Sequence, residues 1–447
     1  MFKNLNLENN SFNRLFMFGF AIIVLVVSIL TPPFQSPDEF AHFERAYTIS
    51  NGQFFLDDKG NGNIDKNLTN FEHFYKAFPF KYEKKNTIQL EHEARNIHWA
   101  NEEHNISLVN TAVYFPIPYI PQAIGISIGR YLDFPIYDSY RLAKLMGILN
   151  CLILLFTANK IYPITPIGYF ILSLPMVIFQ ISSTTPDGMV FSLSLLFGCI
   201  VARGLNAENS FSIYYFMLIC FVFFIISTMK INLFPMILLL ILICNYRKLR
   251  CGYRFFLITL TFILGWLLFA YSSFLSGENF SQGGLGVGGK LKYYLEHKNE
   301  FLQIFINTFS SSELIGSHIK QFIGVLGWLD TSFSYEKYLV LLFFGSMILL
   351  LSLRKVIDNK NLFFNIFILI SGILLTYFLL LLTWTPVTEQ IIHGVQGRYF
   401  IPLVLGFTSM LTIVGKKYQI ANILVLISLI YSGILTISAI NYRYLLS

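Results

Sequence analysis

Residues 21–30 read Ala-Ile-Ile-Val-Leu-Val-Val-Ser-Ile-Leu, and residues 31–39 continue as Thr-Pro-Pro-Phe-Gln-Ser-Pro-Asp-Glu. The first stretch is typical of a transmembrane helix, and the prolines that follow predict its end. The Pro-Pro-Phe-Gln segment lacks the small-x-small pattern of signal-peptide cleavage, so we predict a retained helix. The sequence therefore places two adjacent carboxylates, Asp38 and Glu39, at a membrane surface.

Composition extends this prediction to the whole chain. Of the 447 residues, 55% are hydrophobic and only 13% are charged, and the mean hydropathy is +0.59. Soluble domains have about 25% charged residues. We therefore predict an all-α polytopic membrane protein in which residues 1–447 form one domain of about eleven transmembrane helices. The predicted spans are 15–31, 136–158, 164–182, 187–202, 210–229, 231–244, 255–275, 338–353, 362–384, 400–415 and 419–440.

Lysine and arginine mark one side of the membrane. The loops that carry them contain few acids, which identifies the cytoplasmic side by the positive-inside rule. We predict a cytoplasmic N-terminus, with all eight histidines and most acids outside. The net charge of +7 then reflects orientation, and no nucleic-acid partner is implied. The basic loop residues are Lys160, Arg203, Arg247, Lys248, Arg250, Arg254, Arg354, Lys355, Lys360, Lys416 and Lys417.

Three loops face the predicted outer side. Residues 32–135 form the largest, and its apolar, proline-broken segment 111–122 suits interfacial helices that lie along the membrane. Residues 276–337 form the second, whose glycine run at 283–289 is predicted to be too flexible for a helix. Residues 385–399 form the third. None of the five cysteines lies in the large polar loop, so the sequence predicts neither a disulfide framework nor a metal site.

Asp38 and Glu39 admit two interpretations. One is a general base or metal ligand, since a carboxylate beside apolar surface has a raised pKa. The other is structural, because acids stabilise a helix N-terminus and Ser36 with Glu39 fits a capping box. Both hold if one acid caps and the other reacts. On that helix Asp38, His42 and Arg45 would share one face, and we predict an ion pair between Arg45 and a loop acid.

Lys230 and Arg398 are basic residues on the side where positive charge is disfavoured. Lys230 separates two apolar runs, and a charge near the bilayer is costly without a partner. A phosphate would suit both residues, because Arg398 can bind it bidentately. The alternatives are a lysine that extends to the lipid headgroups and an interfacial role for Arg398 with Tyr399. Asp187, in a short outer turn, either caps the next helix or adds a carboxylate to the site.

Trp328 and Asp330, in the second outer loop, are further candidates. Together they could form a wall on which a sugar stacks. Tryptophan is also common in the interfacial belt of membrane proteins, so the structural interpretation stands beside the functional one.

Four blocks follow one another along the chain: Pro-Pro-Phe-Gln-Ser-Pro-Asp-Glu at 32–39 with Ala-His-Phe-Glu-Arg-Ala-Tyr at 41–47, Asn-Thr-Ala-Val-Tyr at 110–114 with Pro-Tyr-Ile-Pro-Gln at 118–122, Gly-Trp-Leu-Asp at 327–330, and Gly-Val-Gln-Gly-Arg-Tyr-Phe-Ile-Pro-Leu at 394–403. In these blocks the chain resembles a bacterial multispanning membrane-protein family of unknown function that is grouped with the GT-C glycosyltransferases. Two positions depart from the family pattern. Phe40 stands where proline is common, and Thr-Pro-Asp at 185–187 replaces Ser-x-Asp.

The resemblance implies a GT-C-like bundle that takes a sugar from a polyprenyl-phosphate-type donor. The sugar would pass, with inversion, to a cell-envelope glycan or lipid acceptor at the outer face of the bacterial plasma membrane. Asp38 would be the catalytic base, with Glu39 orienting it or exchanging roles. Arg398 and Lys230 would hold the donor phosphate. No metal is required, although Mg²⁺ or Mn²⁺ would suit the acids. The other predicted substrate-binding residues are Arg45, His42, Asp187, Trp328, Asp330, Gln396 and Tyr399.

Other functions fit the same composition. A polymerase of lipid-linked repeat units would carry the same motifs. A transporter or flippase of envelope glycans usually has internal repeats and discontinuous helices that meet at the midplane, and no such symmetry is visible in the sequence. A non-catalytic scaffold for envelope assembly is the third class.

The charge pattern makes a direct prediction about orientation. A reporter fused after Arg250 should read cytoplasmic, because the surrounding loop is the most basic in the chain. A reporter that reads external after Arg250 would invert the predicted topology.

Overall fold

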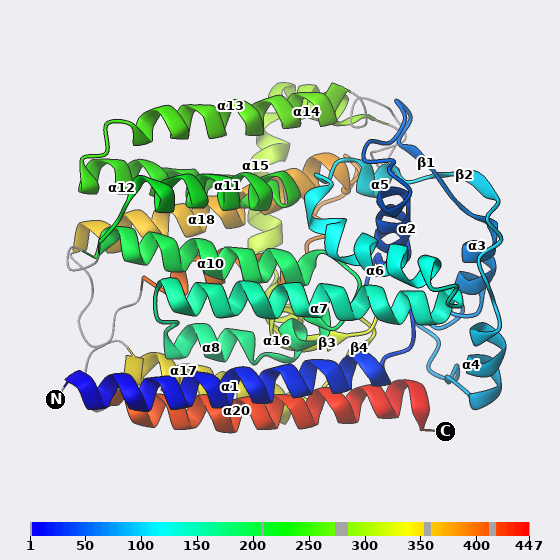
Figure 1. The fold of residues 1–447 in the computed structure, drawn as a ribbon. Helices are drawn as coiled ribbons and strands as arrows, with labels where there is room; N and C mark the ends of the chain where they lie inside the picture. The colour runs from blue at the N-terminus through cyan, green and yellow to red at the C-terminus, as the bar shows by residue number, and fades with distance from the viewer. Residues whose placement is uncertain (1, 207–209, 273–284, 353–358, 411–416, 447) are drawn as a thin grey trace.

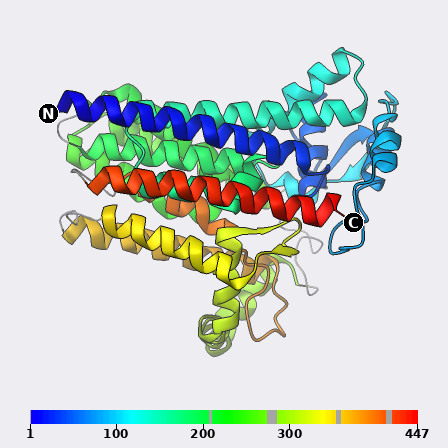
Figure 2. The ribbon, with the colours of Figure 1, turned by 90° about the horizontal axis from the view of Figure 1, so that it is seen from below.

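The computed structural model describes the chain except for residues 1, 207–209, 273–284, 353–358, 411–416 and 447. Its long helices run side by side along one axis (Figures 1 and 2). Seven of the described helices are long and apolar enough to cross a membrane, so the chain is a polytopic membrane protein. They belong to α1 (Phe2–Leu30), α7 (Ile136–Ile161), α10 (Asp187–Leu205), α13 (Gly252–Ala270), α17 (Tyr335–Ser352), α18 (Asn359–Thr383) and α20 (Lys417–Ile440).

The other four predicted spans are shorter or interrupted helices. Proline accounts for two of the interruptions, because it has no N–H to continue a helix: Pro175 starts a new helix within 164–182, and Pro235 lies in a 3₁₀ segment within 231–244. Residues 411–416 of the predicted span 400–415 lie outside the described residues. The segments are α8 (Pro166–Leu172), α9 (Pro175–Ile181), α11 (Ile213–Met229), η2 (Ile231–Ile237), α12 (Leu238–Arg247), η5 (Gly397–Phe400) and α19 (Ile401–Thr408).

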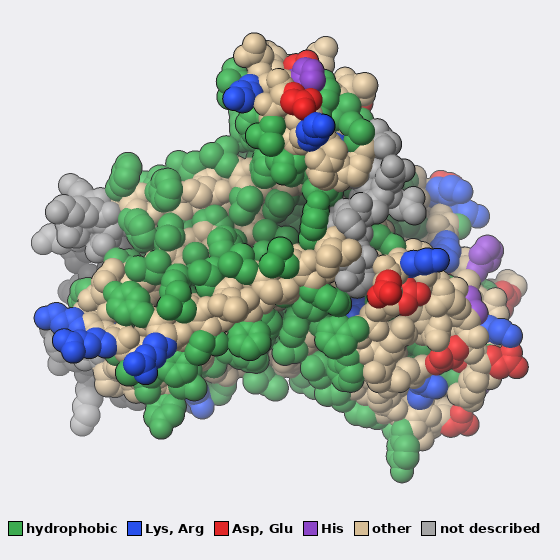
Figure 3. Space-filling model, turned by 90° about the horizontal axis from the view of Figure 1, so that it is seen from above, with side chains coloured by type: hydrophobic (Ala, Val, Ile, Leu, Met, Phe, Trp, Pro, Cys, Tyr) green, Lys and Arg blue, Asp and Glu red, His purple; other side chains and the backbone are tan. Residues whose placement is uncertain are grey.

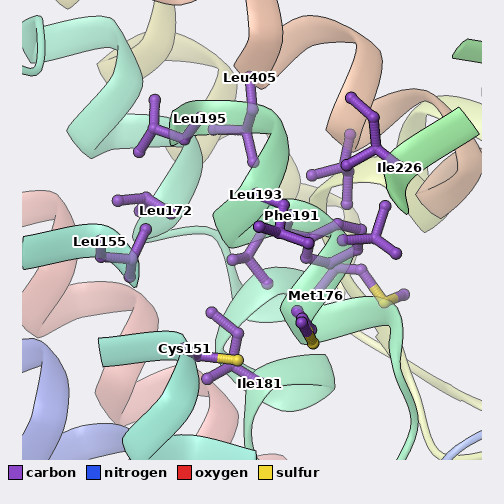
Figure 4. Close-up of a cluster of buried hydrophobic side chains, with 14 of the residues drawn as sticks. Cys151, Leu155, Leu172, Met176, Ile181, Phe191, Leu193, Leu195, Ile226 and Leu405 are labelled. Atoms are coloured by element: carbon purple, nitrogen blue, oxygen red, sulfur yellow. The ribbon is translucent and has the colours of Figure 1, made fainter. Parts of the chain in front are cut away.

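α10 lies at the centre of the bundle and is buried along most of its length. It packs against α7, α11 and α19. Gly198 permits the close approach of α19, since a Cβ atom there would collide with the backbone oxygen of Gly406. Figure 4 shows side chains from these helices meeting in one apolar cluster, among them Cys151, Phe191, Ile226 and Leu405.

The two ends of the bundle differ in charge. In the face shown in Figure 3, hydrophobic side chains cover the middle, lysine and arginine gather at one end, and both signs of charge mix at the other. This distribution is typical of a bundle that spans a bilayer.

The segment between α1 and α7 covers one end of the bundle (Figure 1). It contains a two-stranded antiparallel sheet that the all-α prediction did not include, with Asn61 opposite Ser107 and Asp65 opposite Glu103. Its elements are α2 (Glu39–Ser50), β1 (Asn61–Asp65), α3 (Lys66–His73), α4 (Ile88–Arg95), β2 (Glu103–Ser107), α5 (Val109–Ala112), η1 (Ile117–Tyr119) and α6 (Ile120–Tyr131).

The segment between α13 and α17 projects from the side of the bundle (Figure 2). The prediction of a non-helical glycine run is wrong in part, because Gly288 and Gly289 lie in the first turn of α14, after Gly286 at its N-cap. Residues 283 and 284 of that run lie outside the described residues. The elements are α14 (Val287–Glu296), α15 (Lys298–Ser310), α16 (Ser312–Gly324), β3 (Val325–Leu326) and β4 (Thr331–Ser332).

A buried ion pair connects the two loop segments with the end of α20. Arg443, just beyond α20, contacts Asp330 at 3.2 Å, and both side chains are almost fully buried. Arg443 also donates to the carbonyl of Phe78, while Asp330 accepts from the N–H of Phe80 and, through its backbone carbonyl, from the hydroxyl of Tyr82. The pair therefore joins the first loop, the second loop and the last helix.

Replacing Asp330 with alanine should lower the free energy of unfolding by about 3 to 5 kcal/mol, because it leaves the Arg443 guanidinium buried without its counter-ion. The measurement is thermal unfolding in detergent. The control is Glu102→Ala in the exposed pair with Lys66, which should cost less than about 1 kcal/mol. Equal losses in the two variants would contradict a structural role for the buried pair.

Candidate functional site

Four charged side chains meet at the end of the bundle where α1 ends and α10 begins. Asp38 precedes α2, Asp187 begins α10, Lys230 follows α11, and Arg398 lies in η5. They come from four distant parts of the chain, and we call them the ionic cluster. The sequence-based prediction that these residues share one site is consistent with this arrangement.

Asp187 is the central acid of the ionic cluster. One of its oxygens contacts Lys230 Nζ at 2.9 Å, and the other contacts Arg398 at 3.3 Å. Arg398 reaches Asp38 with its second terminal nitrogen at 3.4 Å. The side chain of Asp187 is 6% exposed and that of Arg398 is 4% exposed, whereas Asp38 is 58% exposed. Asp38 is thus the one member that is open to solvent.

Aromatic and polar neighbours help to hold the two cations away from water. The ring of Tyr399 contacts both cations, with its centroid 5.0 Å from Lys230 Nζ and 5.5 Å from the Arg398 guanidinium carbon. Gln396 accepts a hydrogen bond from Arg398 Nε at 2.7 Å. Burial alone would lower the pKa of Arg398, but Asp187, Tyr399 and Asp38 together raise it above its ordinary value.

His42 lies beside the ionic cluster on the second turn of α2. Its Nδ1 shares a hydrogen bond of 2.9 Å with the hydroxyl of Tyr119, and its ring lies 5.8 Å from that of Tyr114. Burial lowers the pKa of His42 to about 4 against the opposing effect of Asp38 and Asp187, so the ring is neutral near pH 7. Two acids and two bases then leave the ionic cluster with no net charge.

Glu39 is buried and fully engaged. One oxygen accepts from the backbone N–H of Ser36 at 2.9 Å. The other accepts from the hydroxyl of Tyr140 and from both the N–H and the hydroxyl of Thr184, at 2.8 to 3.0 Å. The predicted bond from Glu39 to the Ser36 N–H is present, but the capping box is not formed, because α2 begins at Glu39 with Asp38 at its N-cap and the Ser36 hydroxyl donates to Gln180. Glu39 therefore has no free oxygen with which to exchange roles with Asp38.

Asp38 itself caps nothing with its side chain. Its backbone adopts the left-handed conformation, at φ 62°, which few residues other than glycine favour. The side chain makes no capping hydrogen bond and turns to Arg398 instead. A strained backbone of this kind is retained where surrounding contacts impose it.

Three predicted site residues, Arg45, Asp330 and Trp328, have their hydrogen-bond or ion-pair partners elsewhere in the protein. Arg45 donates to Thr48 and to the carbonyls of residues 53 and 54, so the predicted ion pair with a loop acid is wrong. Asp330 belongs to the buried pair with Arg443. Trp328 donates its indole N–H to the carbonyl of Phe34, and so braces the turn that precedes Asp38.

The structure adds residues that the sequence-based analysis did not select. Tyr114 and Tyr119 line the site beside His42, and Thr184 holds Glu39. Both tyrosines belong to the proline-rich block at 110–122, which the sequence already marked as unusual. The spacing of that block does not show which of its rings face the site. Within the described ranges, no three or more His, Cys, Asp or Glu side chains form a group that could hold a metal ion.

Comparison with known proteins identifies the family. A family model described as a predicted membrane protein, DUF2142, matches residues 20–407, a range that includes all four members of the ionic cluster. No curated protein and no solved structure matches the chain.

Replacing Glu39 with glutamine should lower the free energy of unfolding by about 1 to 3 kcal/mol, because an amide N–H₂ would face hydrogen-bond donors in a buried site. Asp38→Asn is the matched control one residue away, and its exposed side chain should change stability by less than about 0.5 kcal/mol. Thermal unfolding in detergent measures both. A larger loss in the Asp38 variant would contradict this assignment.

Proposed function

Because the chain belongs to the DUF2142 family of predicted membrane proteins, we propose its function from the ionic cluster. It is a membrane glycosyltransferase that moves a sugar from a polyprenyl-phosphate-type donor to a cell-envelope glycan or lipid acceptor. The reaction takes place at the extracytoplasmic face and inverts the anomeric centre. The likeness of the four sequence blocks to proteins grouped with GT-C enzymes supports the same proposal.

One observation carries the proposal: an exposed carboxylate lies against a buried guanidinium at the end of a membrane bundle. Asp38 is accessible to an acceptor hydroxyl, and Arg398 is held in place by Asp187 and Gln396. Lys230 adds a second cation on the far side of Asp187. Cations that are already positioned stabilise a charge that develops during reaction, because they need no reorganisation.

The uneven pairing of Arg398 suggests how the donor enters. Its contacts with Asp187 and Asp38 are each a single pair of atoms, 3.3 and 3.4 Å apart, but Asp187 is buried whereas Asp38 is open to solvent. A donor phosphate displaces Asp38 from Arg398, because guanidinium binds phosphate bidentately. The displacement frees Asp38 and leaves the buried pair of Asp187 and Arg398 intact.

The transfer step then uses the released carboxylate. Asp38 accepts the proton of the acceptor hydroxyl, and the hydroxyl oxygen forms the new bond to the anomeric carbon. The bond from that carbon to the phosphate oxygen breaks, and the phosphate leaves with the electron pair. Arg398 and Lys230 stabilise its increased negative charge, while neutral His42 and the neighbouring Tyr114 lie beside the position where the sugar would bind.

Divalent metal is not needed in this scheme. Both acids of the cluster are already paired with Arg398, and Arg398 together with Lys230 would neutralise the phosphate. Glu39 acts on the geometry by holding the backbone beside Asp38.

Asp38→Asn should reduce sugar transfer by about 100-fold or more, the usual contribution of a general base. Arg398→Ala should weaken donor binding, because alanine has no guanidinium to bind the donor phosphate. The assay is transfer from a polyprenyl-phosphate-linked sugar by purified protein in vesicles, with lipid-linked sugar and surface polysaccharide profiled in cells.

Asp58→Asn is the matched control, an exposed acid in the same loop. It should leave transfer unchanged. Normal surface glycans and no accumulated lipid-linked sugar in a well-expressed Asp38→Asn strain would refute the proposal. Movement of the lipid-linked sugar across vesicles without its consumption would instead identify a flippase.

A further inference from the structure

A cavity of about 460 Å³ lies among α8, α16, α17 and α18, within the size range of ligand pockets in proteins. α17 packs against α8 and α20, whereas α18 packs against η2. The two consecutive helices therefore diverge, and the cavity occupies the space between them. Its walls are almost entirely aliphatic and aromatic, as Phe170, Phe322, Leu341, Leu349 and Phe400 illustrate.

The cavity extends along α17. α17 lines it from Leu341 to Leu349, a rise of about 12 Å along the helix. Of its polar side chains, His318 and Tyr377 bond to each other at 2.9 Å, which leaves little for a polar ligand to bind. A hydrocarbon chain that runs parallel to the membrane helices fits this shape and chemistry.

One end of the cavity is built from the segment that carries Arg398. Phe400 lines the cavity and is the last residue of η5, two positions after Arg398. α16, which forms another wall, packs on the same turn: the N–H of Gly397 donates to Gln321, and a Cβ at residue 397 would collide with the carbonyl of His318. The apolar cavity and the cationic site thus share one rigid element.

We propose that this cavity holds the hydrocarbon chain of the same lipid whose phosphate binds Arg398 and Lys230. The inference rests on the proposed function for the identity of the headgroup. The two cations match a phosphate, and the cavity beside them matches the chain attached to it. In a bilayer the chain gains packing rather than burial from water, so the cavity contributes selectivity for chain shape while the cations contribute most of the affinity.

The test compares two phosphates that differ in their chains. A long-chain polyprenyl phosphate and ethyl phosphate are titrated against the purified full-length protein in nanodiscs. Ser346→Trp fills the cavity from α17, and Leu350→Trp is the control one turn away, at a lipid-facing position that does not line it. Ser346→Trp should weaken binding of the polyprenyl phosphate about tenfold relative to Leu350→Trp and leave ethyl phosphate unchanged.

Equal polyprenyl phosphate affinities in the two tryptophan variants overturn the inference. The inference is also overturned if polyprenol, which has no phosphate, binds as tightly as polyprenyl phosphate, since the cavity would then hold ordinary bilayer lipid. Selective loss in Ser346→Trp without any sugar transfer supports the inference and refutes the glycosyltransferase. Should Ser346→Trp fail to fold, Ile319→Trp fills the cavity from the opposite wall on α16.

Discussion

Glu39 accepts four hydrogen bonds from three segments that are otherwise separate: the turn before α2, helix α7, and the turn before α10. Burying a carboxylate costs several kcal/mol unless donors replace its lost water. Hydrogen bonds to a charged group contribute about 1.5 to 3 kcal/mol each, so the set offsets that cost. The neighbours of Glu39 in sequence and in space are Asp38 and Asp187, and their meeting at Arg398 depends on this one buried charge.

The ionic cluster combines three side chains that are held in place with one that can be displaced. Asp187 and Arg398 are buried and Lys230 is largely so, and all three are paired, so they hold their positions. Asp38 is attached by one exposed contact. A site built this way keeps its cations fixed in the absence of ligand and still offers one place where an anion can enter.

The sequence predicted the parts of this architecture that depend on local composition. Predicted spans such as 136–158 and 419–440 form continuous helices, because no proline interrupts them. The interrupted segments were harder, since Pro175 and Pro235 lie within runs whose hydropathy alone indicates a span. At the site, Lys230 and Arg398 could be identified because they are charged residues between apolar runs. Their ion-pair partners could not be identified, because these come from distant parts of the chain. Arg45 and Arg398 look alike in sequence, and only tertiary contacts send one to backbone carbonyls and the other to two carboxylates.

The buried pair of Asp330 and Arg443 also determines when one part of the fold can form during biosynthesis. The two residues are 113 positions apart, and the ribosome adds roughly 5 to 20 residues per second, so Arg443 is synthesised about 6 to 23 seconds after Asp330. During that interval the first loop is not yet fastened through Phe78 and Tyr82. The enclosure of the polar end is therefore a late event in membrane assembly, and the nascent protein exposes an unpaired acid to the insertion and quality-control machinery until the last helix arrives.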